Sequence, residues 1–252
     1  MTGPRRRGVL VALPLALAVP AGGALLLAGE ARLAARRGPW CPDPPVMPEG
    51  FVVGPAPSIE TAAAEVVWLG DSTAVGVGVS ALDATLPVQV AHQLARPARL
   101  RVLARSGARV ADVLNQQLPR LAGHRPTDVF ISVGTNDAMH LTLRSHFRRD
   151  YGSVLAGLPA SVVRVALLGV PDMGSTPRLP QPLRAVAGWW GRALANDIRT
   201  MARDRHTTFV DIAGGAGFAF RREPQRYFAA DKYHPNDCGY RLWATVVAET
   251  VA

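Results

Sequence analysis

The sequence predicts a three-layer α/β/α sandwich on a five-stranded parallel sheet, preceded by an N-terminal hydrophobic segment. Three observations predict this fold class. Five apolar runs of strand length follow residue 63, and amphipathic segments of helical period separate them. The runs are apolar on both faces, which requires helices on both sides of the sheet. The chain of 252 residues is 48% hydrophobic and 19% charged, values typical of a globular protein.

Each element is predicted from its own local pattern. Short runs rich in valine, leucine and isoleucine predict strands at residues 65–69, 100–104, 128–133, 162–170 and 207–212. Apolar residues at every third or fourth position predict helices at residues 86–94, 109–118, 144–155, 183–203 and 237–250. Crossover helices between successive strands make the sheet parallel. Ligands bind beyond the carboxyl ends of the strands in such a sheet, so a functional site is expected there.

The N-terminus combines a basic start with a long uncharged run. Three arginines at residues 5–7 precede 22 positions, residues 8–29, that carry no charged side chain. This pattern predicts a membrane anchor or a secretory signal peptide within residues 1–37; a buried core helix is the structural alternative. We favour an anchor with the body outside the cytoplasm, so the protein is expected to be extracytoplasmic. Cell fractionation and sequencing of the mature N-terminus distinguish an anchor from a cleaved signal.

A proline-rich linker is predicted at residues 38–63, before a catalytic domain at residues 64–252. Seven of the 21 prolines lie between residues 38 and 57, and such a stretch is typical of a stiff, extended spacer. Cys41 lies in the linker and Cys238 lies near the C-terminus. The two could pair in an oxidising compartment, and the sequence leaves that pairing open.

The basic residues do not indicate a nucleic-acid partner. The formal net charge is +9, but six arginines and one glutamate fall in the first 37 residues. The rest of the chain carries a surplus of only four positive charges. A nucleic-acid-binding surface would concentrate basic residues on one element with aromatic residues between them. The sequence contains no such stripe.

Four polar blocks follow the predicted strands. They are GDST (70–73), RSGA (105–108), GTND (134–137) and DKYHPN (231–236). Taken one at a time, each has a structural explanation as a helix N-cap, a tight glycine turn or an Asx turn. Together they place a hydroxyl, a glycine turn, an amide and a carboxylate–imidazole pair at one edge of one sheet.

These groups are the parts that acyl transfer requires. The hydroxyl of Ser72 needs a base, which His234 can supply, and Asp231 three residues earlier can orient that imidazole. The tetrahedral intermediate needs hydrogen-bond donors for its oxyanion. The backbone N–H groups of Ser72 and Gly107 and the amide of Asn136 are the candidate oxyanion donors.

The four blocks in this order resemble the SGNH hydrolases, also called the GDSL-type esterase and lipase family. The similarity covers residues 65–249, and Thr73 stands where the family name expects leucine, which affects subclass more than catalysis. The resemblance implies a flavodoxin-like fold and a serine hydrolase that needs no cofactor and no metal. It also implies catalytic roles for Ser72, Asp231 and His234, with Ser72, Gly107 and Asn136 as the oxyanion hole.

Two other kinds of site fit the sequence less well. Residues 76–81 match a G-x-G-x-x-A dinucleotide fingerprint, but they start well after the strand end rather than at the strand–helix turn. Asp71, Asn136, Asp231 and His234 offer oxygen and nitrogen ligands, yet a single histidine without an H-x-H or H-E-x-x-H motif is not typical of a catalytic metal site. We therefore predict neither a cofactor nor a metal.

The expected function is an extracytoplasmic serine esterase acting on a small-molecule, lipid or carbohydrate ester, with short-chain or acetyl esters favoured. The alternatives are an acyltransferase or a polysaccharide O-acetylesterase with the same triad, or a non-catalytic binding module tethered to the membrane. The segment after the fourth strand, residues 170–190, is predicted to shape the substrate pocket. Tryptophans at helical positions are more often core residues than pocket residues, so the Trp189-Trp190 pair is expected in the core. The sequence does not indicate an oligomeric state.

Overall fold

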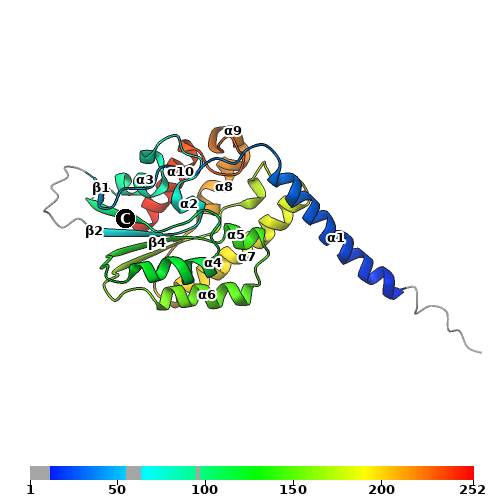
Figure 1. The fold of residues 1–252 in the computed structure, drawn as a ribbon, viewed down its shortest axis with the longest axis horizontal. Helices are drawn as coiled ribbons and strands as arrows, with labels where there is room; N and C mark the ends of the chain where they lie inside the picture. Colours follow the sequence, from blue (N-terminus) through cyan, green and yellow to red (C-terminus); the bar gives the residue numbers. More distant parts are fainter. Residues whose placement is uncertain (1–11, 55–63, 95–96) are drawn as a thin grey trace, which may run out of the picture.

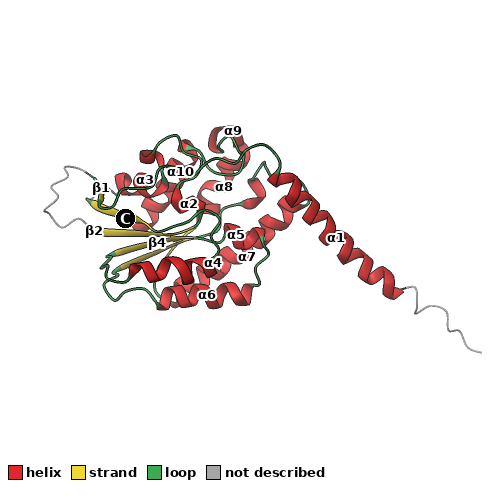
Figure 2. Cartoon of the chain, viewed as in Figure 1, coloured by secondary structure: helices red, strands yellow, loops and turns green. Residues whose placement is uncertain are grey.

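The central sheet of the computed structural model has the strand order β1-β3-β2-β4-β5-β6. The structure describes residues 12–54, 64–94 and 97–252. The predicted basic start at residues 5–7 and the end of the predicted linker, residues 55–63, lie outside the described residues. Helices cover both sides of the sheet, so the predicted three-layer α/β class is confirmed (Figures 1 and 2).

Five strands run parallel, as predicted. They are β3 (Ala98–Val102), β2 (Ala64–Gly70), β4 (Asp128–Ser132), β5 (Arg164–Leu168) and β6 (Thr208–Val210). The described part of the chain adds a sixth strand, β1 (Phe51–Val53), which pairs antiparallel with β3 at the sheet edge. The sheet is therefore mixed rather than purely parallel. β1 is only three residues long and lies in the stretch predicted as a linker, where neighbouring prolines hide the strand pattern.

The two outer layers are built from different parts of the chain. One layer consists of α3 (Leu86–Gln93), α8 (Ile212–Arg222) and α10 (Asp237–Val251). The other consists of α4 (Val110–Asp112), α6 (Arg144–Ala156) and α7 (Leu183–Asp204). The helix predicted at residues 109–118 is irregular, because α4 continues as a π turn over Val113–Gln117 and a 3₁₀ turn over Leu118–Leu121. Pro119 lacks the N–H that a regular helix would use there.

Alternate residues of the central strands fill two separate cores. In β4, Phe130 packs in the core beneath α3 and α10, where its ring stacks on Trp68 at a centroid distance of 4.6 Å. Its neighbours Val129 and Ile131 pack in the core beneath α6 and α7. Burial of each such side chain stabilises the fold by roughly 1.5–3 kcal/mol. This two-sided burial explains why consecutive residues in the middle of β4 are apolar.

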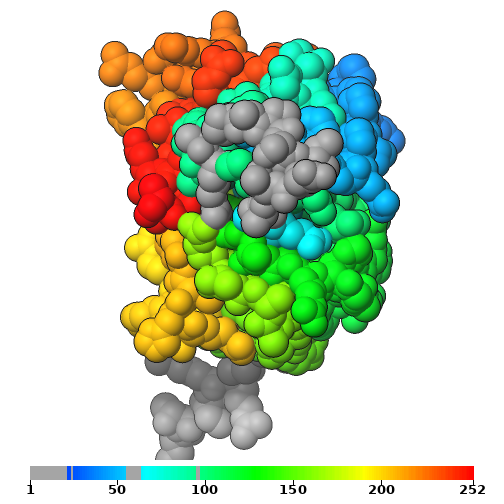
Figure 3. Space-filling model, turned by 90° about the vertical axis from the view of Figure 1, so that its left-hand side faces the viewer, coloured from blue at the N-terminus to red at the C-terminus, as the bar shows by residue number. Residues whose placement is uncertain are grey.

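The N-terminal helix α1 (Ala12–Ala35) projects from the body at the end of the sheet where α5 (Thr135–Met139) and α7 lie (Figure 1). Its last turns dock on the start of α7, where Glu30 Oε2 accepts a hydrogen bond of 2.7 Å from the backbone N–H of Leu183. None of the helices in the described ranges combines the length and the apolarity that crossing a membrane requires. The chain between α1 and β1, drawn in blue, lies along one side of the body (Figure 3).

The polar blocks gather at the carboxyl edge of the sheet. The short helix α2 (Ser72–Val75) follows β2, and α5 (Thr135–Met139) follows β4. Both lie at the end of the sheet from which α1 leaves the body (Figure 1). The first and third polar blocks therefore lie at the edge of the sheet where the sequence predicts a site.

Candidate active site

Ser72, His234 and Asp231 form a continuous chain of hydrogen bonds. Ser72 Oγ lies 3.1 Å from His234 Nε2, and His234 Nδ1 lies 2.7 Å from Asp231 Oδ2. All three side chains are mostly buried, with Ser72 and His234 retaining 6% and 8% of their surface exposed. The structure therefore brings together the hydroxyl, the imidazole and the carboxylate, although 162 residues separate Ser72 from His234.

Gly70 delivers Ser72 to this position. β2 ends at Gly70, whose φ of +144° lies in a region that side-chain-bearing residues rarely adopt. A Cβ at this position would lie 1.9 Å from the carbonyl oxygen of Ser132 on the neighbouring strand. The side chain of Gln117 donates to the carbonyl of Gly70 and accepts from its N–H, each at 2.8 Å. The backbone at the end of β2 is thus fixed by close packing against Ser132 and by the two hydrogen bonds to the Gln117 amide.

Asp71 caps α2 and is fully buried. Its Oδ1 accepts hydrogen bonds from the Thr73 backbone N–H at 3.0 Å and from Thr73 Oγ1 at 2.8 Å. Thr73 Oγ1 also lies 2.7 Å from Ser132 Oγ, which ties α2 to β4. Burial raises the pKa of Asp71 from 3.8 to about 6, and the hydrogen bonds from Thr73 offset only part of that shift.

The raised pKa of Asp71 predicts a pH-dependent stability. Between about pH 4 and pH 6 the native chain holds a proton on Asp71 that the unfolded chain has lost. The free energy of unfolding should therefore fall as the pH rises through this window, by about 3 kcal/mol from this group. Asp71→Asn keeps the acceptor for Thr73 but cannot ionise. The free energy of unfolding, measured by urea denaturation, should therefore fall less between pH 4 and pH 7 for this variant than for the wild type.

Asp83→Asn changes the same side chain at an exposed position and serves as the control. This variant should retain the pH dependence of the wild type. An Asp71→Asn protein with the wild-type dependence would show that Asp71 does not titrate in this range.

Asp231 is held as an anion by hydrogen bonds from several directions. Its Oδ1 accepts from the backbone N–H groups of Tyr233 and His234 at 2.9 and 3.0 Å. Its Oδ2 accepts from the backbone N–H of Cys41 at 3.2 Å, in addition to the contact with His234 Nδ1. Burial alone would raise its pKa, but the hydrogen bonds and charge of His234 outweigh burial and hold the pKa of Asp231 well below its usual range. An ionised Asp231 can orient the imidazole and stabilise an imidazolium.

The candidate oxyanion donors lie in the first turns of α2 and α5 and on the loop between β3 and α4. Gly107 has a φ of +77°, with no atom within 4 Å of the position that a Cβ would occupy. Asn136 Nδ2 donates to the carbonyl of Ala108 at 3.1 Å, which links the amide to the glycine loop. An amide NH₂ has two hydrogens, so the second remains for another acceptor. Ser72 is the first residue of α2, where backbone N–H groups have no partner within the helix.

A small cavity opens beside Ser72 and His234. It encloses about 30 Å³, and its apolar wall includes Met173, Phe220 and Trp243. Residues 171–176 contribute Asp172 and Met173 to the lining, so the segment after β5 helps to shape the cavity. Trp189 and Trp190 are not among its described lining residues: Trp190 Nε1 donates to the carbonyl of Thr142, and Trp189 is largely exposed.

Three contributors to the site were not predicted from the sequence. Gln117 is a buried polar residue at the helical spacing of Val110 and Val113, and a polar residue on this apolar face was the signal that could have indicated it. No local sequence pattern indicates the other two contributors. They are the N–H of Cys41 and the guanidinium of Arg178, which donates to the Asp231 carbonyl at 3.0 Å. Cys41 and Cys238 are both free thiols in the structure. The described residues contain no cluster of three or more histidine, cysteine, aspartate or glutamate side chains arranged for a metal ion.

Comparison with known proteins identifies relatives for most of the body. Residues 68–242 match the model of the GDSL-like lipase/acylhydrolase family. A curated GDSL-like esterase of Mycobacterium tuberculosis is 30% identical over 191 residues, which cover 71% of this chain. The match spans only 58% of that relative's own length.

Solved structures share the fold at lower sequence identity. A putative SGNH hydrolase from Slackia heliotrinireducens superimposes with a TM-score of 0.57 at 23% identity, covering 76% of this chain and 100% of that one. The acetylxylan esterase Axe2 from Geobacillus stearothermophilus gives a TM-score of 0.55 at 17% identity, covering 75% of this chain and 94% of that one. At these identities the likeness concerns the fold.

Proposed function

This chain belongs to the GDSL-like lipase/acylhydrolase family, and from that premise we propose that it is an extracytoplasmic serine esterase that cleaves short-chain or acetyl esters through an acyl-enzyme on Ser72. The family assignment makes it a hydrolase of the GDSL/SGNH class. The location rests on the uncharged run of residues 8–29 behind three arginines. The substrate class rests on the cavity beside Ser72.

One observation carries the proposed chemistry: the unbroken contact from Ser72 Oγ through His234 to Asp231, at 3.1 and 2.7 Å. A serine hydroxyl is a weak nucleophile at neutral pH, and a base within hydrogen-bond distance activates it. His234 Nε2 is within that distance. Asp231 fixes the orientation of the ring from the opposite nitrogen.

The reaction proceeds in two halves. Ser72 Oγ attacks the ester carbonyl while its proton passes to His234 Nε2, and the resulting oxyanion accepts hydrogen bonds from the N–H groups of Ser72 and Gly107 and from Asn136. The C–O bond to the alcohol then breaks, and His234 returns the proton to the leaving oxygen. In the second half, His234 takes a proton from water, whose oxygen attacks the acyl carbon. Ser72 leaves with that proton, and the carboxylic acid is released.

The size of the cavity favours a small acyl group. A cavity needs roughly 10–15 Å³ to hold one water molecule, so about 30 Å³ accommodates two groups of that size. An acetyl methyl fits within this volume. A long acyl chain would have to leave the cavity and lie on the surface.

A series of p-nitrophenyl esters from acetate to palmitate tests this proposal. We expect kcat/KM to be highest for acetate or propionate and to fall at least about tenfold by octanoate. The cavity has no room for the further methylene groups of a longer acyl chain, so their burial cannot stabilise the transition state. Acetylated polysaccharide assayed in parallel tests for a carbohydrate alcohol. A maximum at long chains would overturn the short-chain proposal, and no turnover of any ester would overturn the hydrolase itself. Product analysis with an added alcohol separates hydrolysis from acyl transfer.

A further inference from the structure

The chain segment between α1 and β1 contacts both sides of the candidate active site, although it lies outside the family-matched residues 68–242. We propose that residues 34–43 position the His234–Asp231 pair and the Gly107 loop for the reaction of Ser72. These residues, the last two of α1 and the eight that follow, are here called the strap. This inference rests on the proposed esterase function and assigns positioning residues to it. Four sets of contacts carry the proposal.

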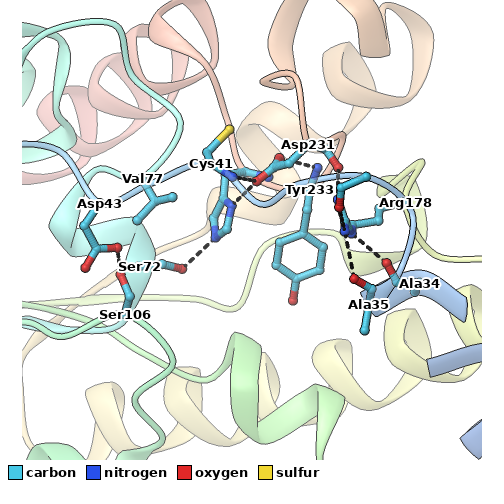
Figure 4. A network of polar contacts seen from close by, with 12 residues as sticks. Ala34, Ala35, Cys41, Asp43, Ser72, Val77, Ser106, Arg178, Asp231 and Tyr233 are labelled. Carbon is cyan, nitrogen blue, oxygen red and sulfur yellow. Dashed lines mark hydrogen bonds and ion pairs between the residues drawn. The ribbon is translucent and has the colours of Figure 1, made fainter. Parts of the chain in front are cut away.

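The first contact fixes the carboxylate of Asp231. The backbone N–H of Cys41 donates at 3.2 Å to Asp231 Oδ2, the same oxygen that lies 2.7 Å from His234 Nδ1 (Figure 4). Because Tyr233 and His234 N–H groups hold Oδ1, the strap supplies the donor that secures the second oxygen. The rotation of the carboxylate is thereby fixed from both sides, and with it the orientation of the imidazole.

The second contact packs an aromatic ring against the base. Trp40 meets the His234 ring edge-on at a centroid distance of 6.0 Å and the Tyr233 ring at 5.2 Å. The guanidinium carbon of Arg178 lies 3.7 Å from the centroid of the Trp40 ring. This cation–π contact holds the indole in place and lets it restrict the tilt of the imidazole.

The third contact joins the strap to the Asp231 backbone through Arg178, which is 1% exposed. Its guanidinium donates to the carbonyls of Ala34 at 2.8 Å and Gly38 at 2.9 Å, and to the carbonyl of Asp231 at 3.0 Å. Ala34 lies in the last turn of α1, where the negative end of the helix dipole favours a cation. The buried guanidinium of Arg178 therefore links the end of α1 to the Asp231 loop through hydrogen bonds to both.

The fourth contact reaches the opposite side of Ser72. Asp43 Oδ1 accepts a hydrogen bond of 2.6 Å from Ser106 Oγ, and Ser106 directly precedes Gly107. In Figure 4, Asp43 and Ser106 lie on one side of Ser72, and Cys41 and Asp231 lie on the other. Prolines at positions 39 and 42 stiffen the backbone between these contacts. One short, extended segment thus connects the base side of the site to the oxyanion side.

Single substitutions in the full-length chain test the strap. Trp40→Ala removes the contact with His234, and Asp43→Ala removes the contact with Ser106. Each is expected to lower kcat for p-nitrophenyl acetate by roughly 10–100-fold, because small displacements of catalytic groups are costly, while KM changes less than about threefold. The rate at which a fluorophosphonate labels Ser72 should fall in parallel for Trp40→Ala. Trp40→Phe keeps an aromatic edge and Asp43→Asn keeps an oxygen acceptor, so both should recover most of kcat.

Two matched variants separate positioning from general stability. Trp189→Ala removes an exposed tryptophan from α7, and Glu49→Ala removes an acidic side chain beyond the strap that pairs with Arg101 at 3.6 Å. Both should keep the wild-type kcat. Values of kcat are expressed per serine titrated by the fluorophosphonate, so loss of folded protein does not count as loss of rate.

The possible results distinguish the two proposals. Strap variants with the kcat and labelling rate of the matched controls, in an enzyme whose wild type is active, overturn the strap proposal alone. A wild-type chain that hydrolyses no ester overturns the proposed function and the strap's role together. A lowered kcat that the conservative variants do not restore also contradicts positioning by these particular contacts.

Discussion

Ser72→Ala should lower kcat for p-nitrophenyl acetate by a factor of at least about 10⁴ while the chain stays folded. Without Oγ no acyl-enzyme can form, and His234 Nε2 loses the group that lies 3.1 Å away. The substitution removes one oxygen beside a cavity and leaves the Asp71 cap and the Gly70 turn in place. Steady-state kinetics together with thermal unfolding measure the two halves of this expectation.

Ser153→Ala provides the matched control for this variant. Ser153 lies on α6, where its hydroxyl donates to the carbonyl of Arg149 within the same helix. Its replacement should leave kcat unchanged. If Ser72→Ala kept the wild-type turnover, another nucleophile would carry the reaction and the acyl-enzyme on Ser72 would be wrong.

Asn136→Ala should lower kcat by roughly 10²–10³ and leave KM close to its wild-type value. The amide of Asn136 already uses one hydrogen on the carbonyl of Ala108 at 3.1 Å, and that bond aims the second hydrogen. A donor that meets the oxyanion only in the transition state stabilises that state and not the bound ester. Michaelis–Menten kinetics with p-nitrophenyl acetate give both constants.

Asn115→Ala, at an exposed position of the π turn, is the control for the amide and should behave as the wild type. An Asn136→Ala protein whose KM rises while kcat holds would indicate that Asn136 binds the ester in its ground state. An unchanged kcat and KM would remove Asn136 from the oxyanion hole.

The sheet could be predicted because its strands are encoded locally. Residues 129–131 of β4 alternate between two cores, so consecutive positions are apolar and the length of the run indicates a buried strand. Parallel connections then bring the ends of β2 and β4 to one edge, and the polar blocks that follow these ends must meet there. The position of Ser72 near Asn136 follows from this topology, whereas the loop of His234 comes after α8 (Ile212–Arg222) and α9 (Pro224–Tyr227) rather than directly after a strand.

The helix α8 shows where local patterns fail. Its sequence includes Gly214, Gly215 and Gly217, and each glycine disfavours a helix by about 1 kcal/mol relative to alanine. A local cap and a tertiary contact override that preference: Asp211 accepts a hydrogen bond from the Gly214 N–H in the first turn, and Arg221 near the end pairs with the distant Asp172 at 3.1 Å. The sequence of residues 212–222 alone includes neither Asp211 nor Asp172, so its local pattern does not indicate a helix.

Contacts between distant segments were equally beyond prediction. Gln117 clamps Gly70 across 47 residues, and Cys41 reaches Asp231 across 190. In both pairs at least one side of the bond is a backbone group, which any residue type supplies. The sequence therefore does not identify the backbone partner in either bond, and only the assembled fold shows it.

The buried guanidinium of Arg178 has a practical consequence for anyone who expresses this enzyme. A recombinant fragment trimmed to residues 68–242 would lack the carbonyls of Ala34 and Gly38 that this cation binds, leaving a charge in the interior with fewer acceptors. The same trimming removes the first four residues of β2 and the larger part of α10, so weak turnover of such a fragment would reflect the trimming and not the full chain. Cloning boundaries for this chain are best drawn upstream of Ala34, with any affinity tag placed at the C-terminal end.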